Sequence, residues 1–184
     1  MKPIVFCNRS LKLKSKLAFH GDLYVNGNLS TAHPLEPEIF GDVFVDGVFS
    51  GNDIVIHGNL VCTDIRCDNL TVDGNILVSD FANVHEEMKS VYGNICILGA
   101  AAIYKLTACE GSIYIGKEAA VDVFKAFDSI YVGGNMHGVS ELMAGDGIVV
   151  EKDISIAKIL TTSNKFLNVH VLSGGIHSEN ININ

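Results

Sequence analysis

A short segment of alternating apolar residues recurs about every 18 residues, and this repeat constrains the fold more than any other feature of the chain. Nine copies begin at Asp22, Asp42, Asn59, Asn75, Asn94, Ser112, Ser129, Gly147 and Asn168. The second and fourth residues of every copy are apolar, as Ile113 and Ile115 are in the sixth. Alternation with period two is typical of a strand that buries one of its faces. The nine copies therefore predict nine short strands stacked in a repeat architecture.

Further short strands fill the rest of each period, beginning at 28, 48, 64, 80 and 153 and again at 53, 69 and 180. Six Gly-Asn dipeptides separate strands, and both residue types tolerate positive φ at a corner. A sheet with crossover helices is excluded, because no intervening segment has ten residues of helical periodicity. The uneven spacing also disfavours the strict six-residue step of a left-handed hexapeptide helix. We therefore expect an all-β fold, a right-handed parallel β-helix, that is, a three-faced β-solenoid of about ten turns.

The whole chain, residues 1–184, is expected to form a single β-helix domain. Residues 3–21 are interpreted as an N-terminal capping turn, and residues 22–184 as the nine repeats. Six segments are longer than a strand and are interpreted as insertions on the third face: 33–41, 82–93, 105–111, 124–128, 140–146 and 158–167. Insertions on solenoids often carry function, so we leave open whether these form a binding site or fold onto the rod.

Composition excludes several classes of partner. The net charge is −8 and only two residues are arginine, whereas phosphate-backbone binders need clustered basic residues, so we expect no nucleic-acid partner. The five cysteines show no C-x-x-C pair, which predicts free thiols in a reducing compartment and no metal site. No apolar run is long enough to span a membrane, and the N-terminus lacks a signal-peptide pattern. Together these features predict a cytoplasmic protein.

The segment GNLVCTDIRCDNLTVDGNI at 58–76 and the x-I-x-V-x-G-N pattern at 22–29, 53–60 and 69–76 resemble the bactofilins. This family forms the polymers of a bacterial cytoskeleton and has a core of three short strands per turn. The resemblance implies a right-handed parallel β-helix, a bacterial source, a polymer-forming or homo-oligomeric protein and no enzymatic activity.

Residues that could support catalysis are few and scattered. The predicted strands place His57 and His170 on distant turns, and His137 and His177 two turns apart. His85 precedes two glutamates but lacks the second histidine of an HExxH motif. Cys62 and Cys67 fall at inward positions, where packing is the expected role. We therefore expect no enzyme, no catalytic residues and no cofactor.

One outward position of the predicted first face is apolar in eight successive copies, and the ninth copy places His170 there. The eight residues are Tyr24, Phe44, Val61, Leu77, Cys96, Tyr114, Tyr131 and Val149. A strand that is apolar on both sides is usually covered on both sides. We interpret this apolar stripe as a lateral protein interface. The alternative is a ladder of side chains that stabilises adjacent turns within one rod.

The two ends of the chain predict two further contacts. The C-terminal ENININ is an uncharged alternating strand after Glu179, so Ile181 and Ile183 are interpreted as an end-to-end interface. Lysines cluster at the N-terminus, where they block edge pairing or, alternatively, contact anionic lipid at a membrane surface: Lys2, Lys12, Lys14 and Lys16.

The predicted function is a non-enzymatic, self-associating scaffold or structural β-helix whose partner is another copy of itself. Two alternatives stay open: a carbohydrate-binding or carbohydrate-processing β-helix, and a monomeric module that binds another protein.

Overall fold

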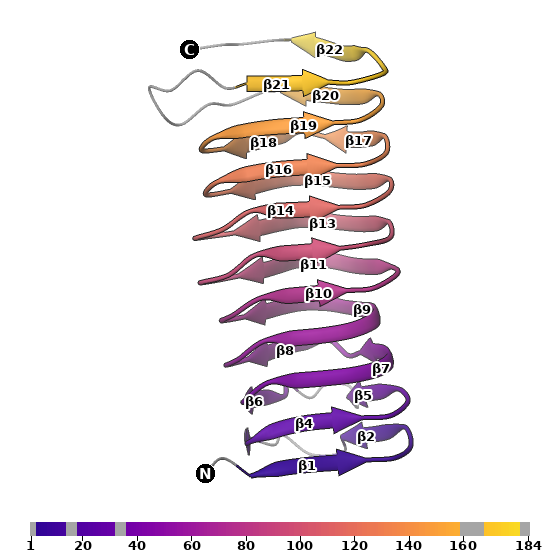
Figure 1. The fold of residues 1–184 in the computed structure, drawn as a ribbon, viewed down its shortest axis with the longest axis vertical. Helices are drawn as coiled ribbons and strands as arrows, with labels where there is room; N and C mark the ends of the chain where they lie inside the picture. Colours follow the sequence, from indigo (N-terminus) through magenta and orange to yellow (C-terminus); the bar gives the residue numbers. More distant parts are fainter. Residues whose placement is uncertain (1–2, 14–17, 32–35, 159–167, 181–184) are drawn as a thin grey trace.

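The computed structural model describes residues 3–13, 18–31, 36–158 and 168–180, and these form a single parallel β-solenoid without helices. Each strand pairs with the strand one coil earlier and one coil later, so every ladder is parallel. In Figure 1 the front strands run from left to right and the chain returns behind them while rising towards the C-terminus. The coil is therefore right-handed, which confirms the fold class expected from the repeat.

Three faces make up each coil, and several long strands continue around a corner from one face to the next. The first face contains β1 (Ile4–Cys7), β4 (Asp22–Val25), β7 (Val43–Ser50), β9 (Leu60–Val72), β10 (Ile76–Val78), β12 (Ile95–Ile97), β14 (Ile113–Ile115), β16 (Ser129–Val132), β19 (Gly147–Val150) and β21 (Asn168–Val171), of which β7 and β9 continue onto the second face. The second face adds β2 (Leu11–Leu13), β5 (Leu29–Thr31), β11 (Ala82–Ser90), β13 (Ala101–Ala108), β15 (Ala119–Ala126), β17 (Met136–Val139), β20 (Ile154–Lys158) and β22 (Ile176–Asn180). The third face contains β3 (Ala18–His20), β6 (Glu38–Phe40), β8 (Asp53–Ile56), the ends of β9, β11, β13 and β15, and β18 (Glu141–Ala144).

Eight strands line the third face in the described part of the chain, so about eight turns have all three faces, slightly fewer than the ten expected. The inward-pointing side chains of the strands fill the interior of the solenoid. Sixteen of the eighteen apolar positions predicted for the first face are less than 5% exposed, and the other two, Val169 and Val171, are partly buried. The two-residue alternation therefore identified the core of this face correctly.

The interpretation of the third-face segments as insertions was wrong for the segments that the structure describes. Residues 82–93 contain the whole of β11, which turns the corner between the second and third faces, and residues 140–146 contain β18. Phe124 and Leu142, assigned to insertions, are fully buried. These strands were missed because the third face lacks the regular apolar pairs of the first: the inward residues of β11 on this face are Met88 and the polar Ser90. The segment 158–167 lies almost entirely outside the described residues.

The corners use glycine and asparagine for a reason other than positive φ. In the described residues no non-glycine residue has positive φ, and among the Gly-Asn pairs only Gly27 does. Gly58 shows what glycine provides: a Cβ there would stand 2.3 Å from the carbonyl oxygen of Gly41 in the preceding coil. Successive coils approach too closely at this corner for any side chain, so glycine is needed for contact distance.

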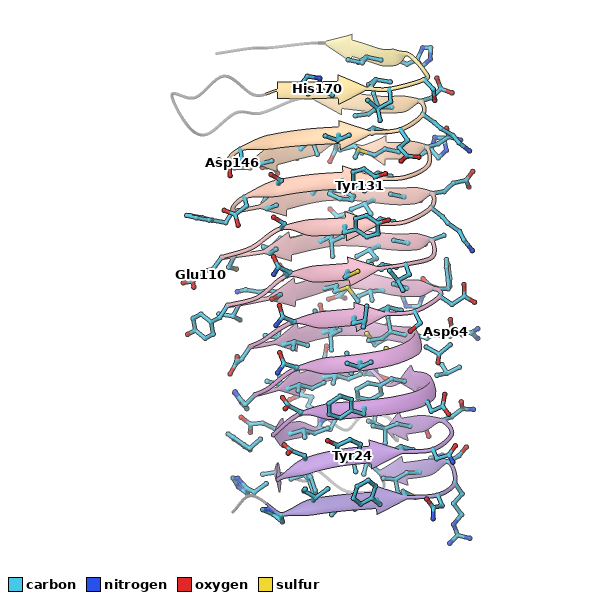
Figure 2. The ribbon with its side chains drawn as sticks, in the orientation of Figure 1. Tyr24, Asp64, Glu110, Tyr131, Asp146 and His170 are labelled. Carbon is cyan, nitrogen blue, oxygen red and sulfur yellow. The ribbon has the colours of Figure 1, made fainter. Side chains whose placement is uncertain are left out.

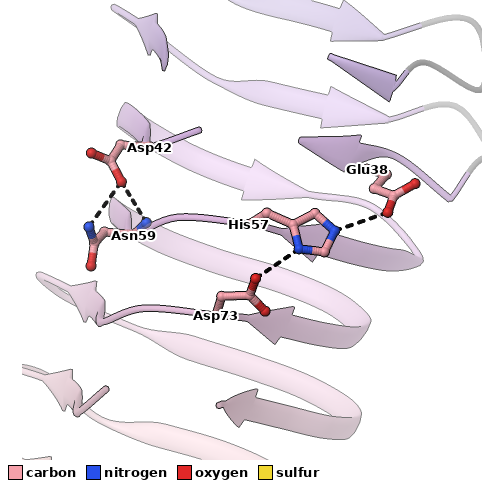
Figure 3. Close-up of polar contacts among 5 residues, drawn as sticks. All are labelled: Glu38, Asp42, His57, Asn59 and Asp73. Atoms are coloured by element: carbon pink, nitrogen blue, oxygen red, sulfur yellow. Dashed lines mark hydrogen bonds and ion pairs between the residues drawn. The ribbon is translucent and has the colours of Figure 1, made fainter. Parts of the chain in front are cut away.

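Polar side chains at the corner before the first face form a ladder along the rod. The Asn59 Oδ1 atom accepts a hydrogen bond of 2.8 Å from the backbone N–H of Asn75, and the Asn75 Oδ1 atom accepts one of 2.9 Å from the N–H of Asn94. Figure 3 shows an earlier rung, in which Asp42 accepts from the backbone and side-chain N–H groups of Asn59. At the corners the backbone hydrogen bonds between strands are interrupted. The side-chain oxygens accept hydrogen bonds from the backbone N–H groups there.

Replacing Asn75 with alanine is expected to lower the free energy of unfolding by about 1 kcal/mol, because the N–H of Asn94 loses its side-chain acceptor. Urea unfolding followed by circular dichroism measures this change. Asn75→Asp keeps the oxygen and is the matched control, expected to lose less than half as much. Equal losses in both variants would show that the amide oxygen does not support the corner.

Candidate interaction surface

One outward residue from each first-face strand lies in a continuous line, which we call the outer column. Backbone register places its ten members directly over one another: Phe6, Tyr24, Phe44, Val61, Leu77, Cys96, Tyr114, Tyr131, Val149 and His170. In Figure 2 the labelled Tyr24, Tyr131 and His170 project from the front strands. All eight residues of the predicted apolar stripe are therefore in one column, and His170 continues it. Phe6 was missed because residues 3–21 were interpreted as a capping turn, although IVFC alternates like the repeats.

Aromatic rings of the column stack on one another along the rod. Tyr24 lies between Phe6 and Phe44 at centroid distances of 4.8 and 4.6 Å, and Tyr114 stacks on Tyr131 at 4.9 Å. This is the intramolecular ladder that the sequence left open as the alternative, and it stabilises adjacent coils. The rings use their faces for these contacts, so their edges form the outer surface of the column. The ladder and an external contact through those edges are compatible.

The other two faces interrupt their outward columns with polar and charged side chains. The second-face column contains Lys12, Ser30, Ser50, Arg66, Asn83, Ala102, Ala120 and His137. On the third face Lys105 pairs with Glu87 and Lys125 pairs with Glu141, each with N–O distances of 2.9 Å. The first face is thus the one with an uninterrupted apolar column from β1 to β19.

A polar contact fixes one ring of the outer column. The hydroxyl of Tyr131 donates a short hydrogen bond to a carboxylate oxygen of Glu151, one coil further on. This bond and the negative charge of Glu151 raise the pKa of Tyr131 to about 12. The hydroxyl is therefore neutral near pH 7, and its hydrogen bond to Glu151 fixes the ring against the rod.

The predicted contacts at the rod ends lie mostly outside the described residues. Ile181 and Ile183 are outside them, as are Lys2, Lys14 and Lys16. Lys12 is described, and its exposed side chain begins the second-face column. Residues 3–13 and 18–20 form a coil of the same type as the repeats, because β1, β2 and β3 pair with β4, β5 and β6.

A histidine cluster that sequence reasoning did not identify joins three successive coils at the corner after the third face. His57 Nε2 lies 2.9 Å from Glu38 Oε1, and its Nδ1 lies 2.8 Å from Asp73 Oδ2 (Figure 3). Its ring also stacks on Phe40, which stacks on His20. The sequence did contain a signal for this cluster: His57 is separated from Asp73 and Glu38 by 16 and 19 residues, which is about one repeat. Because both ring nitrogens are occupied, His57 serves here as a bridge between coils.

The hydrogen bonds to Glu38 and Asp73 raise the pKa of His57 above 6.5. Because the pKa of His57 is higher in the folded than in the unfolded chain, protonation of its ring stabilises the fold. This stabilisation is complete at pH values below the unfolded-state pKa and is lost as the pH rises through the folded-state pKa. We expect His57→Gln to lower the unfolding free energy by about 1 kcal/mol at pH 5.5 and by less at pH 8.5. Chemical denaturation at the two pH values measures both. His137→Gln, on an exposed second-face residue, should change stability by less than about 0.5 kcal/mol. A His57→Gln effect that grows with pH would contradict this assignment.

The buried cysteines are core residues. Cys62 and Cys67 are 1% and 4% exposed, and burial raises the pKa of each thiol to about 12. All five cysteines are free.

Among the residues that the structure describes, no three His, Cys, Asp or Glu side chains gather so as to hold a metal ion. No helix in the same part of the chain is long and apolar enough to cross a membrane.

Comparisons of the chain with protein-family models, with curated proteins and with solved structures found no match. The resemblance to bactofilins therefore rests on the repeat and corner pattern alone.

Proposed function

We propose that this protein is a non-enzymatic structural rod that associates with other copies of itself, as the resemblance to bactofilins implies. The observation that carries the proposal is the outer column. It extends along the first face from β1 to β19 without a charged residue, whereas the second and third faces carry charged side chains. Contiguous apolar surface of this extent is typical of protein–protein contacts.

The energetics of such a contact are favourable at the order-of-magnitude level. Burying roughly 500 Å² of apolar surface contributes about 12 kcal/mol before the costs of association, which are about 4 to 15 kcal/mol. Stacking covers both faces of Tyr24 and one face of each other phenylalanine or tyrosine ring in the column. The contact therefore uses mainly ring edges, together with Val61, Leu77 and Val149. To bury enough apolar surface, the contact has to extend along several coils, and a second copy of the rod is long enough to provide this.

The stacking also bears on the carbohydrate-binding alternative. An open hollow beside the N-terminal part of the outer column is lined by Phe6, Tyr24 and Phe44 and by the polar Asn26 and Asp46. A sugar ring packs against an aromatic face, but both faces of Tyr24 are covered by Phe6 and Phe44. This arrangement favours self-association over sugar binding.

Size-exclusion chromatography and negative-stain imaging of the purified chain test the proposal. We expect dimers or larger rod assemblies that form without another component. A monomer that binds immobilised oligosaccharides would support the carbohydrate alternative instead. A monomer that binds neither itself nor sugars would leave the rod as a module for another protein and contradict self-association.

A further inference from the structure

The order of large and small side chains along the outer column specifies how two rods pair. Numbering coils by their first-face strands, the aromatic residues occupy coils 1 to 3 and coils 7 and 8. Val61, Leu77 and Cys96 occupy coils 4 to 6, and Val149 occupies coil 9. The column is therefore not uniform: it has a smaller middle section between two aromatic sections.

We infer, on the basis of the proposed function, that two copies pair antiparallel through their outer columns, about a two-fold axis that passes beside Cys96. This axis runs along the strand direction, so coil 6 of one rod faces coil 6 of the other. Coils 2 to 10 of one rod then face coils 10 to 2 of the other, and coil 1 with Phe6 extends beyond the overlap. The pairing then places Phe44 opposite Val149, Val61 opposite Tyr131, and Leu77 opposite Tyr114.

Each of these three encounters joins an aromatic ring and a smaller aliphatic side chain, whereas coils 2 and 10 bring Tyr24 opposite His170. Two sheets that pack face to face are separated by about 10 Å, and large residues opposite small ones fill that space evenly. A parallel pair would put every residue opposite its own copy. Tyr131 would then meet Tyr131 while Val61 met Val61, which overfills one layer and leaves a void in another. Shape thus favours the antiparallel pair.

A second feature of coil 6 supports the same axis. Leu98 follows Cys96 at the end of the strand and is 49% exposed. The residues aligned with it in the adjacent coils are Ser79 and Gly116, so Leu98 is an isolated apolar side chain at this corner. Antiparallel pairing about coil 6 brings Leu98 against its own copy and covers both. A two-fold contact uses the same patch twice, as most homodimers do.

Charge does not favour this register. Asp42 would face Gly147 of the other copy, so it meets no like charge there. Asp46 would face Glu151 in the same row as Leu98. This like-charge pair opposes the register, and salt reduces the repulsion. Glu151 is also the acceptor for the Tyr131 hydroxyl.

Thiol cross-linking of the intact chain with a short bismaleimide first tests the lateral contact at coil 6, where both orientations place Cys96 opposite its own copy. The partly buried Cys7 and Cys109 are first changed to serine, which leaves Cys96 as the accessible thiol because Cys62 and Cys67 are buried. We expect most chains of this variant to be recovered as a covalent dimer. The further change Cys96→Ser should abolish the product.

A cysteine moved away from the axis tests the direction. In the chain with Cys7, Cys96 and Cys109 changed to serine, Val149→Cys alone should give no covalent dimer, because six coils, or about 29 Å, separate its two copies. Mixed with a Phe44→Cys chain in the same background, it should cross-link. Efficient self-cross-linking of Val149→Cys would overturn the antiparallel arrangement while leaving self-association intact. If every variant is a monomer by light scattering, both the arrangement and the proposed function fail.

Discussion

Replacing Leu77 and Tyr114 with glutamate is expected to convert the self-associated rod into a folded monomer. The two residues belong to coils 5 and 7 of the outer column, on either side of Cys96. An unpaired carboxylate buried in a contact costs several kcal/mol, so the affinity should fall at least about a hundredfold. Light scattering measures the mass, and circular dichroism shows whether the strand content is unchanged. Tyr131 stays unchanged in this variant, because a glutamate at that position would lie beside Glu151 and add repulsion within one rod.

The matched control places the same two charges on the same two coils of the second face. Asn83 and Ala120 occupy the outward column of coils 5 and 7 there, so Asn83→Glu with Ala120→Glu adds equal charge without touching the first face. This variant should keep the mass of the unmodified protein. If the Leu77 and Tyr114 variant also kept that mass, the outer column would be a ladder within one rod and no lateral contact.

Replacing Phe124 with alanine is expected to lower the free energy of unfolding by about 3 to 5 kcal/mol. Its side chain is fully buried within β15 and packs in the hydrophobic core, so its removal leaves a cavity. Urea or guanidinium unfolding followed by circular dichroism measures the loss. A β-solenoid can unfold in more than one step, so the comparison uses the midpoint of the transition in which β15 unfolds.

Phe127, three residues further on, is the matched control. It is 66% exposed at the corner, and Phe127→Ala should change stability by no more than about 0.5 kcal/mol. A small effect at Phe124 would mean that residues 124–128 are the surface insertion that the sequence suggested. A similar effect at both positions would contradict the assignment of the third face as core.

The first face could be predicted from the sequence because one rule determines it. Except for Cys62, the inward residues of the nine consecutive repeats are β-branched or aliphatic, as Ile95 and Ile113 are, and the parallel ladder keeps them in register. The third face could be predicted only in part: the strands beginning at 53 and 69 are β8 and the end of β9, as expected, but its later strands were interpreted as insertions. In those later strands the second inward residue is polar or small, as Ser90 and Ala108 are, so the pair of large apolar residues that marks the first face is missing. Ser90 is tolerated inside because its hydroxyl donates to the carbonyl oxygen of Gly74.

The candidate surface was partly predictable for the same reason. Alignment of the repeats placed Tyr24 and Tyr131 in one stripe, because outward positions repeat as regularly as inward ones. The stacking of the rings and the bond from Tyr131 to Glu151 depend on side-chain orientation, which the repeat does not specify. The bridge from His57 to Glu38 and Asp73 was missed because the histidines were compared with one another and not with carboxylates one repeat away.

The most direct test of self-association is the mass of the purified chain by sedimentation equilibrium, measured over a series of dilutions. One chain has a mass of 19.8 kDa. The proposed function predicts at least twice this mass at micromolar concentration, with dissociation towards one chain only on strong dilution. A mass of 19.8 kDa at every concentration would contradict it.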